Sequence, residues 1–154
     1  MRNQDKLLIL NENAKSLEDA VNWLKRSQTI CTGFNIENLS PEGMDAFEGL
    51  TSRFARVCDI LFNKLFRSIF YLEEGEAGSW LDVILYMEKE NVITSAEDAR
   101  VMKELRNDIV HEYADNDLTL IFKEVLKQSP LLINYVNNTL EKVIVLKDKI
   151  KPTN

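Results

Sequence analysis

Residues 40–72, SPEGMDAFEGLTSRFARVCDILFNKLFRSIFYL, predict one long helix that determines the class of the fold. Ser40 followed by Pro41 is typical of a helix start, with an N-cap and then proline at the first helical position. At about 100° per residue, the apolar side chains gather on one side of this helix. They are Phe47, Leu50, Phe54, Cys58, Leu61, Phe62, Leu65 and Ile69. We expect this side to face a core, because a helix buries its apolar stripe against a partner.

The opposite side of the same helix carries four cations, here called the basic stripe: Arg53, Arg56, Lys64 and Arg67. The whole chain has a net charge of −6 and a pI near 4.9. This acidity argues against a protein that coats nucleic acid by general electrostatic attraction. The stripe is therefore either a solvated face or a local contact surface for RNA or a protein partner.

The rest of the chain also has helical periodicity. Residues 3–32 predict an earlier helix that stops near Gly33. Residues 73–79, EEGEAGS, predict a loop, and residues 80–91 predict a short helix after it.

Two further helices are expected in the C-terminal part. Thr94 and Glu97 have the T-x-x-E spacing of a capping box, which would begin a fourth helix. A last helix should run from about Leu118 to Lys149, and Pro130 should kink or split it because proline removes a backbone hydrogen bond.

Composition sets the class of protein. The 154 residues are 45% hydrophobic and include only five glycines and three prolines, which favours one all-α domain over residues 1–154, an up-and-down bundle of about five helices. Neither a signal-peptide core nor a run of apolar residues long enough to span a membrane occurs, so we expect a cytoplasmic protein. Cys31 and Cys58 lie outside any CxxC spacing and should be buried thiols. With a single histidine, a metal site within one chain is not expected.

The stretch RNDIVHEY, residues 106–113, contains that histidine. A helical wheel places polar and basic side chains on one face, apart from the apolar Met102, Leu105 and Ile109. The face consists of Arg100, Lys103, Arg106, Asn107, Val110, His111 and Tyr113.

The residue types on this face suit phosphodiester chemistry. The guanidinium of Arg106 is shaped to bind phosphate, and Asn107 is four residues from His111 and could orient its ring. One histidine cannot easily be both general base and general acid, but a second subunit would supply another. An RNA substrate provides its own nucleophile, the 2′-hydroxyl. Arg, Asn and His are also common on exposed helix faces, so spacing alone does not decide between a site and ordinary surface.

Residues 106–113 resemble the R-x4-H-x-Y motif of the HepT toxins in the HEPN (higher eukaryotes and prokaryotes nucleotide-binding) superfamily of helical bundles. Residues 45–70 resemble the second long helix of that family. The resemblance covers roughly residues 44–115.

The resemblance implies a homodimer, formed through the motif helix, that acts as a metal-independent endoribonuclease and leaves a 2′,3′-cyclic phosphate. Arg106 and His111 would be catalytic and Asn107 would support them. Tyr113 would be the residue to which a cognate nucleotidyltransferase antitoxin attaches AMP from ATP, the protein itself needing no cofactor. Arg100, Lys103 and the basic stripe are candidate contacts for RNA or a partner.

Two alternatives remain at this stage. The chain could be a non-catalytic HEPN partner or substrate-binding subunit of a nucleotidyltransferase, which would need no catalytic His111. It could also be an inert helical dimerisation module, which would leave the clustered polar face without an explanation.

Overall fold

A computed structural model describes residues 2–111 and 118–150, and within these ranges all regular structure is helical. The elements are α1 (Asn3–Cys31), α2 (Pro41–Ile60), the π-helical segment η1 (Leu61–Leu65), α3 (Phe66–Glu74), α4 (Trp80–Lys89), α5 (Ala96–Val110) and α6 (Leu118–Ile150). Because α2, η1 and α3 follow one another without a break, they form one rod, here called the α2–α3 rod. The described residues thus form five continuous helices, which confirms the all-α prediction.

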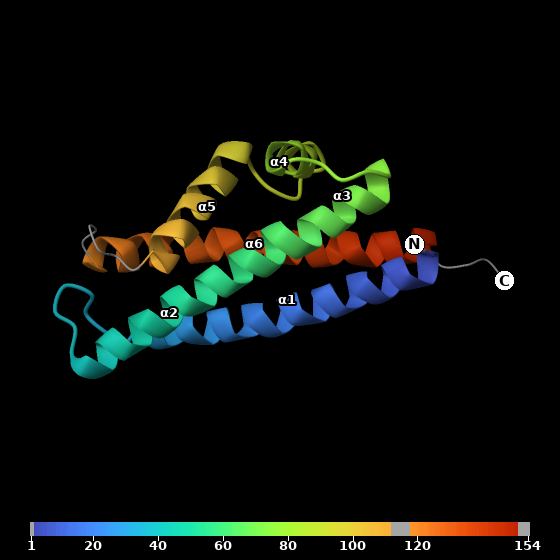
Figure 1. The fold of residues 1–154 in the computed structure, drawn as a ribbon. Helices are drawn as coiled ribbons and strands as arrows, with labels where there is room; N and C mark the ends of the chain where they lie inside the picture. The colour runs from blue at the N-terminus through green and yellow to red at the C-terminus, as the bar shows by residue number, and fades with distance from the viewer. Residues whose placement is uncertain (1, 112–117, 151–154) are drawn as a thin grey trace.

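Three long helices make the body of the molecule (Figure 1). α1 and α6 lie side by side, and the α2–α3 rod crosses the face in front of them. The short helices α4 and α5 pack along the side of the rod opposite to α1. Successive helices alternate in direction except α4, which is seen nearly end on. The predicted up-and-down order therefore holds for the other four helices, while α4 runs across it.

The start of α2 and its buried side agree with the sequence. Ser40 is the N-cap and its hydroxyl oxygen accepts a hydrogen bond of 3.1 Å from the Gly43 N–H. All eight apolar residues assigned to the core side are buried, none more than 5% exposed. Burial of this stripe against α1 and α6 stabilises the rod, because each large apolar side chain contributes roughly 1.5–3 kcal/mol on full burial.

The π-helical segment was not expected from periodicity. Leu61 and Phe62 are both buried, and so are Leu65 and Phe66. In a regular α-helix these four positions also span only about 140°, so their burial accompanies the π turn but does not require it. The rod continues to Glu74 and ends where Gly75 adopts a positive φ of 77°. The predicted loop is therefore shorter by two residues.

The predicted capping box at Thr94 and Glu97 is wrong by one residue. α5 is capped by Ser95, whose hydroxyl oxygen accepts a bond of 3.0 Å from the Asp98 N–H. The Thr94 hydroxyl is used elsewhere, since it lies 2.6 Å from the buried Tyr135 hydroxyl of α6 and donates to Asp98 Oδ2 at 2.8 Å. A tertiary contact thus takes Thr94 away from the cap.

α6 continues through Pro130 as one helix, so of the two predicted outcomes, a kink or a split, the split does not occur. Pro130 is exposed, so its ring does not disturb the core. The adjoining Ser129 is buried and donates from its hydroxyl to the Val125 carbonyl at 2.6 Å. Packing against α1, α2 and α5 holds both halves of α6 together.

The remaining sequence features have simple placements. Cys31 and Cys58 are free, buried thiols, as predicted. Burial raises the pKa of the Cys31 thiol to about 11 and raises that of Cys58 further. In residues 2–111 and 118–150, no helix combines the length and apolar character needed to cross a bilayer.

Candidate functional site

α5 packs against the α2–α3 rod with its apolar side, as the helical wheel predicts. Met102 and Leu105 are buried at 0% and 5% exposure, and Ile109 is half-buried. The polar face of α5 carries the half-buried Arg106 and ends at the exposed His111. This arrangement confirms that His111 is not part of the core.

Arg106 is held against the rod by Asp59, a residue of α2. Arg106 Nε donates to Asp59 Oδ1 at 2.6 Å and Nη2 donates to Oδ2 at 3.1 Å, so the pair is bidentate. A third bond of 3.3 Å runs from Arg106 Nη1 to the amide oxygen of Asn107. The guanidinium is fixed in one plane by these three contacts.

Arg106 still has donors to offer. A guanidinium carries five N–H groups, and the three bonds above use three of them, which leaves two within the described part of the chain. Hydrogen bonding to Asp59 raises the pKa of Arg106 further above its ordinary value, so the group is always charged. Its side chain is 30% exposed. An oriented, partly exposed cation of this kind can bind a phosphate oxygen.

Sequence reasoning did not find Asp59. It lies 47 residues from Arg106 in the chain, and a helical wheel treats each helix alone. One signal was present: Asp59 is the only acidic residue between Glu48 and Glu73, in a stretch that carries the basic stripe. A lone carboxylate on such a helix is a good candidate for pairing with a cation of another element.

A small hollow of about 100 Å³, with a mixed polar and apolar lining, adjoins this pair. It is lined by Cys58, Asp59, Phe62, Asn63, Trp80, Lys103, Arg106 and Asn107. Phe62 and Asn63 belong to the π-helical segment, and such single π turns occur frequently at functional sites. The hollow brings together four elements, α2, η1, α4 and α5, around one fixed guanidinium.

His111 is the C-cap of α5, because the helix ends at Val110. Its backbone N–H bonds to the Asn107 carbonyl at 3.0 Å, and its side chain is exposed. The amide of Asn107, expected to orient His111, instead accepts from Arg106. Tyr113 lies outside the described residues.

The two other basic residues of α5 have partners. Arg100 forms ion pairs with Glu97 and Glu104 on its own helix, so this turn of α5 has no excess positive charge. The Lys103 ammonium lies 4.4 Å from the centroid of the Trp80 ring, and both residues line the small hollow beside Arg106. Of these two candidate contacts, only Lys103 lies beside Arg106.

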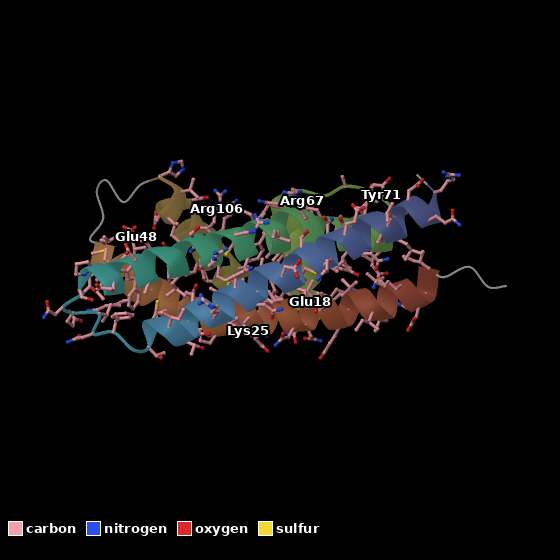
Figure 2. All side chains as sticks on the ribbon, turned by 90° about the horizontal axis from the view of Figure 1, so that it is seen from below. Glu18, Lys25, Glu48, Arg67, Tyr71 and Arg106 are labelled. Carbon is pink, nitrogen blue, oxygen red and sulfur yellow. The ribbon has the colours of Figure 1, made fainter. Side chains whose placement is uncertain are left out.

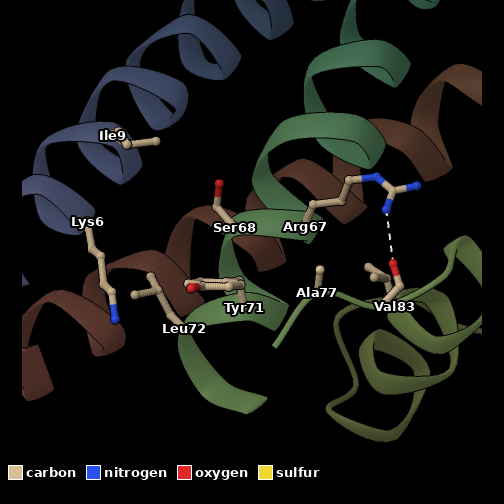
Figure 3. A pocket seen from close by; sticks show the side chains of 9 residues that line it. Lys6, Ile9, Arg67, Ser68, Tyr71, Leu72, Ala77 and Val83 are labelled. Carbon is tan, nitrogen blue, oxygen red and sulfur yellow. Dashed lines mark hydrogen bonds between the residues drawn. The ribbon is translucent and has the colours of Figure 1, made fainter. Parts of the chain in front are cut away.

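Two residues of the basic stripe contact different neighbours of the rod. The guanidinium of Arg53 lies 4.8 Å from the ring centroid of Trp23 on α1. Arg67 Nη1 donates to the Gly78 carbonyl at 3.2 Å, the dashed line in Figure 3, beside a mainly apolar hollow of about 280 Å³. Lys64 is exposed between them. Figure 2 shows Arg67 and Arg106 along the same edge of the molecule.

Comparison with known proteins gives no match to a family model and no significant match to a curated protein. Within residues 2–111 and 118–150, no three His, Cys, Asp or Glu side chains form a group that could hold a metal ion.

Proposed function

We propose that this protein is a toxin of the HEPN type: a metal-independent endoribonuclease that cleaves RNA in the cytoplasm at a site composed of two chains. The observation that carries the proposal is Arg106, oriented by Asp59 and Asn107 on the helix that ends at the exposed His111. This is the residue pair that the R-x4-H resemblance singles out. The fixed orientation of the Arg106 guanidinium supports phosphate binding.

The chemistry needs two histidines, and a homodimer supplies them. A neutral His111 takes the proton of the 2′-hydroxyl while the 2′-oxygen forms a bond to phosphorus. The bond from phosphorus to the 5′-oxygen breaks, and a protonated His111 of the second copy gives its proton to that oxygen. The products are a 2′,3′-cyclic phosphate and a 5′-hydroxyl. Arg106 stabilises the charge that develops on the phosphate oxygens.

A surface beside the end of α5 supports dimerisation through the motif helix. Val110 is 47% exposed and lines a hollow of about 420 Å³ with Ile109 of α5 and Ala55 of α2. The same hollow is also lined by Glu48, Thr51 and Ser52, so an exposed apolar side chain stands beside polar groups, as at many protein interfaces. A second copy seated there would bring the two ends of α5 close together.

Regulation follows from the same site. We propose that a nucleotidyltransferase antitoxin uses ATP to attach AMP to Tyr113, two residues after His111. The added anionic phosphate would compete with RNA phosphate for Arg106, as phosphorylation does near arginine groups.

The activity is tested with purified protein and single-stranded RNA in the presence of EDTA. Wild-type protein should cleave, and Arg106→Ala and His111→Ala should each reduce cleavage by about 10²-fold or more, since each removes a group that acts in the transition state. Lys127→Ala on α6, at an exposed position that does not line the hollow beside Arg106, is the matched control. Light scattering and circular dichroism should show the same dimer and the same fold for all variants.

One observation favours the alternative of a non-catalytic nucleotidyltransferase subunit. The Asp59 carboxylate already neutralises Arg106, as in a purely structural ion pair. This alternative would be established, and the nuclease contradicted, by two results together. The protein would bind the nucleotidyltransferase, and any trace of RNA cleavage would be equal in the wild type and in His111→Ala.

A further inference from the structure

The chain has two tryptophans, and both lie at the surface of the α2–α3 rod with a cation over the ring. Trp23 of α1 is 49% exposed, with the guanidinium carbons of Arg53 and Arg26 at 4.8 and 5.8 Å from its ring centroid. Trp80 of α4 has Lys103 at 4.4 Å. Half-exposed tryptophan beside arginine is typical of surfaces that bind a partner rather than of ordinary solvated surface.

Trp23 lines a polar hollow between α1 and α2 of about 430 Å³. The other lining residues are Ser16, Asp19, Ala20, Arg53 and Arg56. The volume falls in the range of about 300–1,000 Å³ that holds small organic groups. Asp19 is the one acidic residue of this lining, and its carboxylate is paired with Lys15 at 3.0 Å. The hollow therefore offers an aromatic ring, two guanidinium groups and oxygen acceptors.

This hollow and the hollow beside Arg106 share no lining residue, but α2 contributes to both. Arg56 precedes Asp59 by three residues, which is about one helical turn, so the two lie on neighbouring turns of α2. Figure 1 shows the rod crossing between α1 on one side and α4 with α5 on the other. A ligand lying across the rod can thus contact Trp23 and Arg53 at one end and Arg106 and Lys103 at the other.

We propose that this face binds single-stranded RNA, with a base stacked on Trp23 and with Arg53 and Arg56 on phosphates. The proposal takes RNA as ligand from the proposed function and deepens it by naming the binding path outside the cleavage site. Aromatic rings with interspersed cations are the means by which proteins bind unpaired strands. A base can enter the hollow only when it is unstacked, which excludes a duplex. Ser16 and Asp19 can accept from a ribose 2′-hydroxyl, which DNA lacks.

Binding is measured separately from cleavage, in the full-length His111→Ala variant, by anisotropy of a short labelled single-stranded RNA of mixed sequence. In this background Trp23→Leu should weaken binding about tenfold, while Trp23→Phe should retain most of the affinity because a ring remains. Tryptophan fluorescence should be quenched by RNA, and Trp23→Phe should remove most of that quenching.

The charge contribution is tested by salt dependence. Arg53→Gln with Arg56→Gln should reduce the slope of log K against log salt by about 1.4, the value for two phosphate contacts on a single strand. The matched control is Lys25→Gln with Lys127→Gln, two exposed lysines, of which Figure 2 shows Lys25 away from the edge that carries Arg106. The control removes the same charge and should leave the slope nearly unchanged.

The proposal is overturned if Trp23→Leu and the Arg53/Arg56 variant bind RNA as the control does. It is also overturned if duplex RNA or single-stranded DNA of the same sequence binds as tightly as single-stranded RNA. Equally tight binding of poly-glutamate would overturn it too, because that result would indicate an acidic protein partner. If wild-type protein does not cleave RNA but the variants still lose RNA binding, the proposed nuclease activity is rejected and the binding path is not. Normal cleavage with an unchanged KM in Trp23→Leu rejects the binding path only.

Discussion

Asp59 is the residue that most changes the interpretation of the motif. Its ion pair with Arg106 is partly exposed, at 40% and 30% of the two side chains, so its contribution to stability is small, roughly 0–1 kcal/mol. Its larger effect is geometric, because two bonds to one carboxylate fix the plane of the guanidinium. Asp59 is therefore a positioning residue for Arg106.

Replacing Asp59 by asparagine tests this role. Asp59→Asn keeps the shape but removes the charge and one acceptor, so Arg106 should lose its fixed orientation. We expect kcat for RNA cleavage to fall by about tenfold or more with little change in KM, because misplacement affects the reacting geometry. The free energy of unfolding should fall by no more than about 1 kcal/mol. Kinetics and thermal unfolding measure the two effects.

The matched control is Asp45→Asn, an exposed acidic residue near the start of the same helix. It should change neither quantity. Full activity in Asp59→Asn would show that Arg106 does not need its partner for function.

At the scale of the element, packing overrides local preference in two helices. The π-helical segment Leu61–Leu65 interrupts the α-helical rod at a place where two adjacent pairs of apolar residues face the core. α6 keeps Pro130 in its interior although proline cannot donate to the carbonyl four residues before it. In both cases burial of long apolar stripes offsets the lost regularity.

The cost of Pro130 can be measured directly. Proline in a helix interior is about 3 kcal/mol less favourable than alanine, and up to about 1 kcal/mol of this is offset because proline restricts the unfolded chain. Pro130→Ala should therefore stabilise the protein by about 2 kcal/mol, a rise in Tm of about 4–8 °C for a chain of this size. Thermal unfolding followed by circular dichroism gives the value.

Glu141→Ala, at another exposed position of α6, should shift stability by less than about 0.5 kcal/mol. A lower Tm for Pro130→Ala than for wild type would mean that the backbone shape imposed by proline is required for packing.

At the scale of the whole molecule, acidic side chains stabilise contacts between and within helices. Hydrogen bonding to Ser79, first of all to its backbone N–H, lowers the pKa of Asp82. The hydrogen bond from Lys142 lowers the pKa of Glu90, and the hydrogen bond from Arg100 lowers the pKa of Glu97. Glu90 links α4 to α6 through Lys142 at 3.1 Å. Each of these groups binds protons more weakly in the folded than in the unfolded chain.

Stability should consequently fall at acid pH. Groups with a lowered folded pKa contribute stability above their ordinary pKa, which is 3.8 for Asp82 and 4.5 for the two glutamates, and lose it as the pH falls through the folded values. We expect the Tm to begin to drop below about pH 4.5. Thermal unfolding at pH 7, 5, 4 and 3 measures the effect. Glu90→Gln should show a shallower drop, and a Tm that stays constant to pH 3 would contradict the assignment.

Helix content and the main core could be predicted because they follow from short-range periodicity. The 3.6-residue repeat in residues 40–72 placed the buried side of the rod correctly, and Ser40 with Pro41 marked its start. On α5 the same repeat separated Met102 and Leu105 from the polar face. These features depend on neighbours within one or two helical turns, which a linear sequence displays.

The tertiary structure alone decided which residues meet across helices. It paired Arg106 with Asp59, drew Thr94 to Tyr135 and so moved the cap of α5 to Ser95, and placed Trp23 against the basic stripe. It also kept α6 whole at Pro130, through burial summed over an entire helix. These outcomes depend on contacts between residues more than 25 positions apart and on packing of the complete core, which local patterns such as the lone carboxylate of Asp59 do not specify.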